Sequence, residues 1–127
     1  MEKYTIKATS NTPTIEFDLE KGELSISGRS IPENSVEFYN PLFSAIDLYS
    51  KNPKSTTLNI QLEYFNSSSS ACLLSLFKRL EKIKKAADRP VLINWLYEEN
   101  DEDILNAGKN FEGMVDLPFT MIQVSEN

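Results

Sequence analysis

The chain has 127 residues, of which 40% are hydrophobic, and its 13 basic and 19 acidic residues give a formal net charge of −6. This size and composition predict one domain, spanning residues 1–127, with a single hydrophobic core. The negative charge disfavours nucleic acid and anionic membranes as partners. Histidine is absent and there is one cysteine, so the chain lacks the usual ligands of a structural metal and the usual general base of hydrolases. We therefore expect no metal, no cofactor and no enzymatic activity.

The hydropathy pattern argues against insertion into a membrane. No apolar run approaches the roughly 20 residues that a membrane-spanning helix needs. The opening residues, MEKYTIKATS, lack the basic and then apolar order of a signal peptide. A cytoplasmic location is expected.

The first half of the chain predicts a β-hairpin followed by a helix. Apolar and polar residues alternate over Pro13–Asp18 and again over Glu23–Ser27, with a glycine-containing turn between them. Asn34, with Glu37 three residues later, resembles a capping box at the start of a helix. Pro41 lacks a backbone donor, so we expect a kink there or a start later than Asn34. The apolar residues at helical spacing are Phe38, Leu42, Phe43, Ile46 and Tyr49.

The second half of the chain predicts strands that alternate with helices. The β-branched and aromatic stretch Thr56–Phe65 predicts a strand, and two more are expected over Val91–Tyr97 and Phe119–Val124. One helix should end before Pro90, and another should run from Asp101 to about Met114. The order ββαβαβαβ indicates an α/β fold with a mixed, mostly parallel central sheet, an N-terminal hairpin at its edge and about three helices. We expect its core to contain Leu58, Ile60, Leu73, Phe77 and Ile93.

Four consecutive serines, Ser67–Ser70, stand where a strand gives way to a helix. Either Asn66 or Ser67 is suited to cap that helix, but one cap contributes about 1 kcal/mol and needs only one such side chain. A helix N-terminus with hydroxyl groups and no acidic residue also suits a phosphoryl group, because free amides stabilise the added charge. From the residues alone, both a serine-capped helix and a phosphorylation switch stay open.

Five blocks in one order resemble the SiaC family of regulatory phosphoproteins. They are the segment Asn11–Asp18, GRSIPENSVEFYNPL (Gly28–Leu42), LEYFNSSSS (Leu62–Ser70), NWLYEENDEDILNAG (Asn94–Gly108) and DLPF (Asp116–Phe119). The resemblance spans nearly the whole chain. It implies a fold similar to that of STAS domains, the anti-sigma-factor-antagonist class.

The resemblance also implies a function in signal transduction. Such a protein is a non-enzymatic switch that a serine/threonine kinase phosphorylates and a PP2C-type phosphatase dephosphorylates. In its unphosphorylated form it binds and activates a diguanylate cyclase or similar effector, which connects it to cyclic di-GMP. The family's phosphoacceptor follows an asparagine, so the resemblance places it at Ser67. Since serine here replaces the family's usual threonine and more serines follow, Ser68 is the alternative acceptor.

Several residues near the serine run are candidates for partner binding. The turn before the first helix is interpreted either as turn chemistry or as a neighbour of the phosphosite, with Arg29 positioned to read the phosphate. Tyr64 is expected in the core by default, or as an anchor for a partner if it is exposed. The candidates in these segments are Arg29, Pro32, Glu33, Asn34, Tyr64, Asn66 and Ser69.

The acidic run from Glu98 to Asp103 supplies the other candidates, Glu98, Glu99 and Asp101. The run lacks the glycine and distal glutamate of an EF-hand, and acids stabilise the first turn of a helix, so a solvated helix start is one interpretation. Partner binding at the same end of the sheet as Ser67 is another. Two alternatives to the switch remain: a small enzyme that uses these carboxylates, or a constitutive scaffold.

Overall fold

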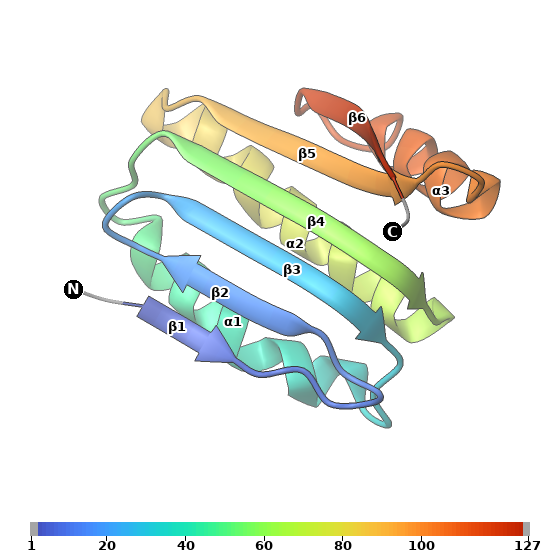
Figure 1. The fold of residues 1–127 in the computed structure, drawn as a ribbon. Helices are drawn as coiled ribbons and strands as arrows, with labels where there is room; N and C mark the ends of the chain where they lie inside the picture. The colour runs from blue at the N-terminus through green and yellow to red at the C-terminus, as the bar shows by residue number, and fades with distance from the viewer. Residues whose placement is uncertain (1–2, 126–127) are drawn as a thin grey trace.

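The computed structural model describes residues 3–125, which form one six-stranded sheet and three helices (Figure 1). The strands are β1 (Lys3–Ile6), β2 (Thr14–Asp18), β3 (Glu23–Ser30), β4 (Thr56–Phe65), β5 (Val91–Glu98) and β6 (Phe119–Val124). The helices are α1 (Ser35–Tyr49), α2 (Ser67–Ala87) and α3 (Glu102–Glu112). This arrangement confirms the predicted α/β class, whereas the similarity to STAS domains stays a prediction.

The strands lie in the sheet in the same order as in the chain, β1-β2-β3-β4-β5-β6. The first three pair antiparallel, and β3 to β6 pair parallel. Each parallel connection therefore steps to the next strand in one direction, and right-handed crossovers then place every connecting helix on the same face. Figure 1 shows the helices behind the sheet, with the opposite face uncovered. We call this opposite face the open face.

The prediction of a two-stranded N-terminal hairpin at the sheet edge is wrong in extent, because β1 lies outside it. The segment Lys3–Ile6 has four residues, and its side chains are exposed or half-buried, so its alternation gives little signal. The strand predicted to end at Ser27 also continues to Ser30. It passes through Gly28, whose φ of 115° is open to glycine but strained for other residues.

Helix α1 begins as the capping box predicts. The Asn34 side chain accepts a hydrogen bond from the main-chain nitrogen of Glu37 at 3.1 Å, and the Asn34 carbonyl accepts one from Phe38. The alternative of a later start is wrong, since the helix runs from Ser35 to Tyr49 with Pro41 inside it. Pro41 leaves the carbonyl of Glu37 without its helical donor, and Glu37 is exposed, so water can take the donor's place.

Helix α2 is the longest helix. It ends at Ala87, with Asp88 in the left-handed conformation, which confirms the predicted end before Pro90. Lys84 and Lys85 in its last turn complement the negative end of the helix dipole. None of the helices in residues 3–125 has the length and hydropathy that crossing a bilayer requires.

The hydrophobic core lies between the sheet and its helices. The five residues predicted there are all at most 1% exposed: Leu58, Ile60, Leu73, Phe77 and Ile93. Phe111 of α3 joins them, with its ring centroid 5.1 Å from that of Phe77 on α2 and 5.6 Å from that of Trp95 on β5. Helix α3 therefore packs on the same face of the sheet as α2.

Candidate functional site

The candidate residues lie where the parallel strands β3, β4 and β5 end. The carboxyl ends of parallel strands meet at one end of a sheet, and here β4 passes directly into α2 through Asn66. The main-chain nitrogen of Asn66 donates to the carbonyl of Ser30, the last residue of β3, at 3.2 Å. The N-terminus of α2 is thus fixed beside the end of the neighbouring strand.

Asn66 caps α2. Its side chain accepts a hydrogen bond from the main-chain nitrogen of Ser69 at 2.9 Å, and its carbonyl accepts one from Ser70 at 2.9 Å. Of the two caps that the sequence allowed, the structure therefore selects Asn66. Ser67 is exposed, and its side chain makes no hydrogen bond with another residue of the described part. Its hydroxyl is free of any capping role.

The next two serines belong to a hydroxyl cluster formed by Ser30, Ser35, Tyr39, Ser68 and Ser69. The Ser69 hydroxyl donates to the carbonyl of Ser30 at 2.9 Å, and its Oγ lies 2.8 Å from Ser30 Oγ. Ser30 Oγ is 2.6 Å from Tyr39 Oη, and Ser35 Oγ is 2.7 Å from Ser68 Oγ. Ser69 is 0% exposed, so this candidate for partner binding lies in the interior. Within the run Ser67–Ser70, only Ser67 and Ser68 are exposed.

Burial keeps the hydroxyl cluster uncharged. It raises the pKa of Tyr39 to about 12, with the hydrogen bond between Tyr39 and Ser30 acting in the opposite direction. Burial also raises the pKa of the nearby Cys72 thiol. Both groups stay protonated at neutral pH, so Tyr39 acts as a hydroxyl partner within the cluster and Cys72 as a small apolar side chain.

Tyr64 is exposed because β4 contains a bulge. Gly28 pairs with Leu62 but Arg29 pairs with Tyr64, so Glu63 is an extra residue in β4. Leu62 is buried, and a regular strand would bury Tyr64 two residues later. The bulge leaves Tyr64 52% exposed instead. Such irregularities re-aim side chains next to functional sites, and no local sequence pattern predicts this one.

The turn from β3 to α1 lies beside the serine run. Arg29 is exposed, and its guanidinium forms no ion pair with any residue between 3 and 125. Pro32 is buried, Glu33 is exposed, and Asn34 is exposed while it caps α1. Ser30 and Ser35, at the two ends of this turn, contact the serine run, and neither was among the candidates predicted from the sequence.

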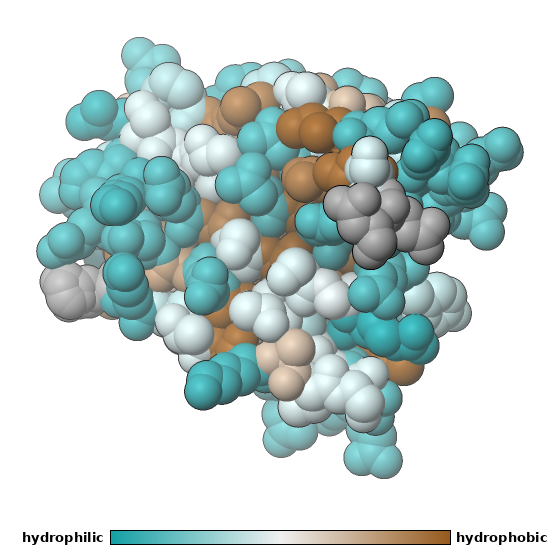
Figure 2. All heavy atoms as spheres, in the orientation of Figure 1, coloured by the Kyte–Doolittle hydropathy of each residue, from teal (hydrophilic) through white to brown (hydrophobic). Residues whose placement is uncertain are grey.

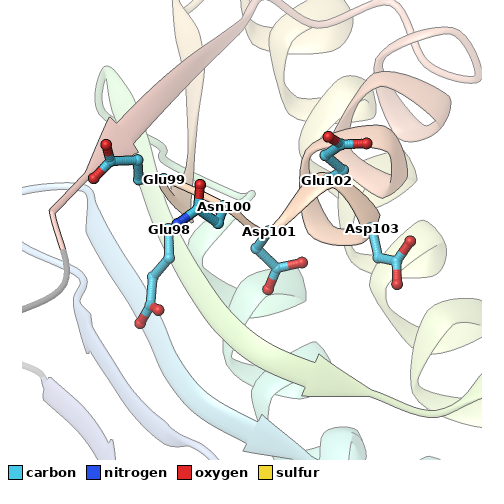
Figure 3. A pocket seen from close by; sticks show the side chains of 6 residues that line it. All are labelled: Glu98, Glu99, Asn100, Asp101, Glu102 and Asp103. Carbon is cyan, nitrogen blue, oxygen red and sulfur yellow. The ribbon is translucent and has the colours of Figure 1, made fainter.

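The acidic run does not bring its carboxylates together. Figure 3 shows the side chains of the run pointing in different directions around an open pocket of about 450 Å³. Asp101 caps α3 by accepting a hydrogen bond from Ile104 N at 3.0 Å, as expected for acids at a helix start. Within residues 3–125, no group of three or more potential ligands is placed to hold a metal ion.

The acidic run and Tyr64 share a surface. Asp101 and Asp103 line a pocket of about 340 Å³ together with Tyr64 and Phe65. Figure 2 views the open face, where hydrophobic side chains show between polar ones. The partly buried apolar residues that β5 and β6 contribute to this face are Leu92, Leu96, Ile122 and Val124.

The fold and the site define a class of protein. It is a small α/β domain that exposes a hydroxyl group at a helix N-terminus, beside an exposed tyrosine and acidic side chains that point apart. The chain also matches the SiaC family over residues 6–124, described as the SiaC family regulatory phosphoprotein. The protein belongs to the SiaC family of regulatory phosphoproteins.

Comparison with individual proteins supports the same family. SiaC of Pseudomonas aeruginosa is similar in structure, with a TM-score of 0.88 and 26% identity, over 98% of this chain and 100% of that one. The crystal structure of the P. aeruginosa diguanylate cyclase SiaD in complex with its activator SiaC contains a chain with a TM-score of 0.89 and 27% identity, over 95% of this chain and 99% of that one. An uncharacterized protein of P. aeruginosa strain UCBPP-PA14 is 28% identical over 95% of this chain and 96% of its own length.

Proposed function

We propose that this protein is a cytoplasmic switch controlled by reversible phosphorylation of Ser67. A serine/threonine kinase adds the phosphoryl group, and a PP2C-type phosphatase removes it. The unphosphorylated form binds and activates a diguanylate cyclase. The observation that carries the proposal is at the start of α2, where Asn66 caps the helix and the exposed Ser67 hydroxyl has no hydrogen-bond partner within residues 3–125.

The first turn of α2 suits an added negative charge. It contains no acidic residue, whereas α1 has Glu37 and α3 has Glu102 and Asp103 in their first turns. The positive end of a helix dipole is normally complemented by such acids. The first turn of α2 lacks this negative charge, and a phosphoryl group on Ser67 would supply it.

A charge at Ser67 would alter the surface that a partner meets. Tyr64 precedes Ser67 by three residues, and it lines a pocket with Asp101 and Asp103. Repulsion between exposed charges is of order 1 kcal/mol per close pair in water. Tyr64 and the neighbouring Arg29 are exposed, and Tyr and Arg are among the residue types that dominate binding interfaces. Phosphorylation therefore changes binding while the core beneath keeps its packing.

The choice of a diguanylate cyclase as effector is supported by the similarity to the SiaC chain that is seen with SiaD. The two alternatives lack comparable support. A small enzyme would need carboxylates that converge on a substrate, and those of the acidic run point apart. A constitutive scaffold does not explain why the exposed Ser67 hydroxyl forms no hydrogen bond within residues 3–125.

The experiment compares Ser67→Ala, Ser67→Asp and the control Ser44→Ala, which removes an exposed hydroxyl from α1. Binding to a purified SiaD-type diguanylate cyclase and the rate of cyclic di-GMP synthesis are measured. Ser67→Ala and Ser44→Ala should bind and activate as the wild type does. Ser67→Asp should bind more weakly, although it carries about half the charge of a phosphoserine.

Phosphorylation itself is measured by mass spectrometry after incubation with ATP, Mg²⁺ and a lysate of the source organism. The wild type should gain a phosphoryl group at Ser67, and a metal-loaded PP2C-type phosphatase should remove it. The proposal fails if the serine run is never modified and all three variants bind the cyclase equally. If the protein is instead an enzyme, the wild type should turn over a substrate, and the Asp101→Asn variant should fold but lose this activity.

A further inference from the structure

Two adjacent serines, Ser67 and Ser68, are both exposed, but their hydroxyl groups differ in their partners. Ser68 Oγ lies 2.7 Å from Ser35 Oγ and donates to Asn66 Oδ1 at 3.2 Å. Ser67 Oγ has no hydrogen-bond partner in the described part of the chain. Exposure alone does not separate the two serines as phosphoacceptors, whereas hydrogen bonding does.

The partner of Ser68 is itself held rigidly. Ser35 is the first residue of α1 and is 3% exposed. Its Oγ also lies 3.3 Å from Ser69 Oγ, which donates to the carbonyl of Ser30. A buried hydroxyl that has lost a partner is costly, so the cluster favours the conformation in which Ser35 and Ser68 stay in contact.

We propose that Ser35 determines which serine is phosphorylated, because it holds the Ser68 hydroxyl against the N-terminus of α1 and leaves Ser67 as the acceptor. This inference rests on the proposed function, since it concerns the selectivity of the same modification. Ser35 is a specificity-determining residue that does not itself react.

The selectivity follows from what phosphoryl transfer demands of the acceptor. The hydroxyl oxygen attacks the γ-phosphorus of ATP in line with the leaving ADP, and its proton passes to the aspartate of the kinase. Ser68 Oγ would have to leave both Ser35 and Asn66 to reach that position. Ser67 Oγ gives up no hydrogen bond within the described chain. The new oxygen–phosphorus bond is therefore easier to form at Ser67.

The first arm of the test needs no kinase. The melting temperatures of Ser35→Ala, Ser68→Ala and the double variant form a double-mutant cycle. If the two hydroxyl groups are partners, the double variant loses less than the sum of the two single losses. The cycle of Ser35→Ala with Ser67→Ala is the matched control and should be additive. Additive losses in both cycles would overturn the proposal.

The second arm locates the phosphoryl group by fragmentation mass spectrometry, with a lysate of the source organism, ATP and Mg²⁺ as the kinase source. The wild type and Ser68→Ala should be modified at Ser67, and Ser67→Ala should be left unmodified. Ser35→Ala should gain a second phosphoryl group at Ser68, and Ser35→Ala/Ser67→Ala should be modified at Ser68. Circular dichroism establishes that each variant is folded.

The outcomes separate this inference from the proposed function. If the wild type is never phosphorylated, the proposed function is wrong, and the inference that Ser35 determines which serine is phosphorylated is wrong as well. If Ser67 is modified in the wild type and Ser68 stays unmodified in Ser35→Ala, only the role of Ser35 is overturned. If Ser67→Ala is modified at Ser68 as fast as the wild type is modified, Ser35 does not protect Ser68.

Discussion

The indole Nε1 of Trp95 donates a hydrogen bond to the main-chain oxygen of Ile104, 2.8 Å away. This bond fixes the indole of a β5 residue against the first turn of α3. Gly108 lies one turn further along α3, and a Cβ at that position would come within 2.5 Å of Trp95 Cδ1. Helix α3 approaches the sheet this closely because position 108 has no side chain.

Gly108→Ala should therefore destabilise the protein, although alanine is the better helix former by about 1 kcal/mol. The indole is held by its hydrogen bond and by the ring of Phe111, so it has little room to move. Overpacking of this kind costs about 1–3 kcal/mol of unfolding free energy, measured by urea denaturation. Gly113→Ala is the control, since its Cβ would meet nothing closer than 3.6 Å. Equal stability of the two variants would contradict this account.

Phe77→Ala should cost about 3–5 kcal/mol, because it leaves a cavity in the core. Phe77 is 0% exposed, and its ring centroid lies 5.1 Å from that of Phe111 and 5.3 Å from that of Phe119. Leu48→Ala, at a position 62% exposed on α1, should cost far less. Chemical denaturation measures both losses, and a loss below about 1 kcal/mol for Phe77→Ala would be inconsistent with its burial.

Ser69→Ala should cost about 0.5–1.5 kcal/mol, because it removes buried hydrogen bonds while each of their partners keeps another one. The carbonyl of Ser30 keeps the hydrogen bond from the Asn66 nitrogen, which sets the loss below that of an orphaned buried group. Ser44→Ala, which removes an exposed hydroxyl, is the control. The unfolding free energies of the two variants should differ clearly, and a match would mean that the hydroxyl cluster adds no stability.

Glu81 should make stability depend on pH in the acid range. A hydrogen bond from the main-chain nitrogen of Asp116, 2.7 Å from Glu81 Oε2, holds the pKa of this carboxyl below its ordinary value of 4.5, with smaller contributions from Lys85 and Lys78. A depressed folded-state pKa adds stability above the unfolded-state value, and this stability is lost as pH falls through the folded-state pKa.

In Glu81→Gln the melting temperature should therefore fall less than in the wild type as the pH drops from neutral to below 4.5. Glu112→Gln removes an exposed carboxylate and is the matched control. Thermal scans at a series of pH values compare the three proteins. Parallel curves for Glu81→Gln and the wild type would show that the Asp116 contact contributes nothing to folding.

Removal of divalent cations should leave the melting temperature unchanged. The acidic run carries the charge that a cation would need, but its side chains point in different directions. Thermal scans with and without EDTA test this expectation, since a bound ion stabilises the folded state in proportion to its affinity. A fall of several degrees with EDTA would reveal a cation site.

The sequence predicted those elements whose signals are local. Alternation over Thr56–Phe65, helical spacing in the two long helices and the start of β6 all depend on neighbouring residues, and each predicted strand and helix was found close to its expected position. Strand β1 was missed because four residues with half-exposed side chains form a strand only through pairing with β2. Its formation depends on tertiary contacts more than on intrinsic propensity.

The candidate site was predicted only in part, for the same physical reason. Capping preferences limited the N-cap of α2 to Asn66 or Ser67. Parallel pairing of the strands predicted that the candidate residues gather at one end of the sheet. The contact between Ser35 and Ser68 joins residues 33 positions apart, and it depends on how α1 and α2 meet. The bulge that exposes Tyr64 is set by the register between β3 and β4, which no local pattern encodes.

Because the strands occupy the sheet in chain order, each one pairs with the strand synthesised just before it. A nascent chain that leaves the ribosome can add its strands one at a time, without waiting for a distant C-terminal segment to complete an inner position. Short separations between pairing partners reduce the loop-closure entropy that slows folding. We expect the antiparallel β1-β2-β3 unit to form first during synthesis, and pulsed hydrogen exchange on stalled chains of increasing length would follow that order.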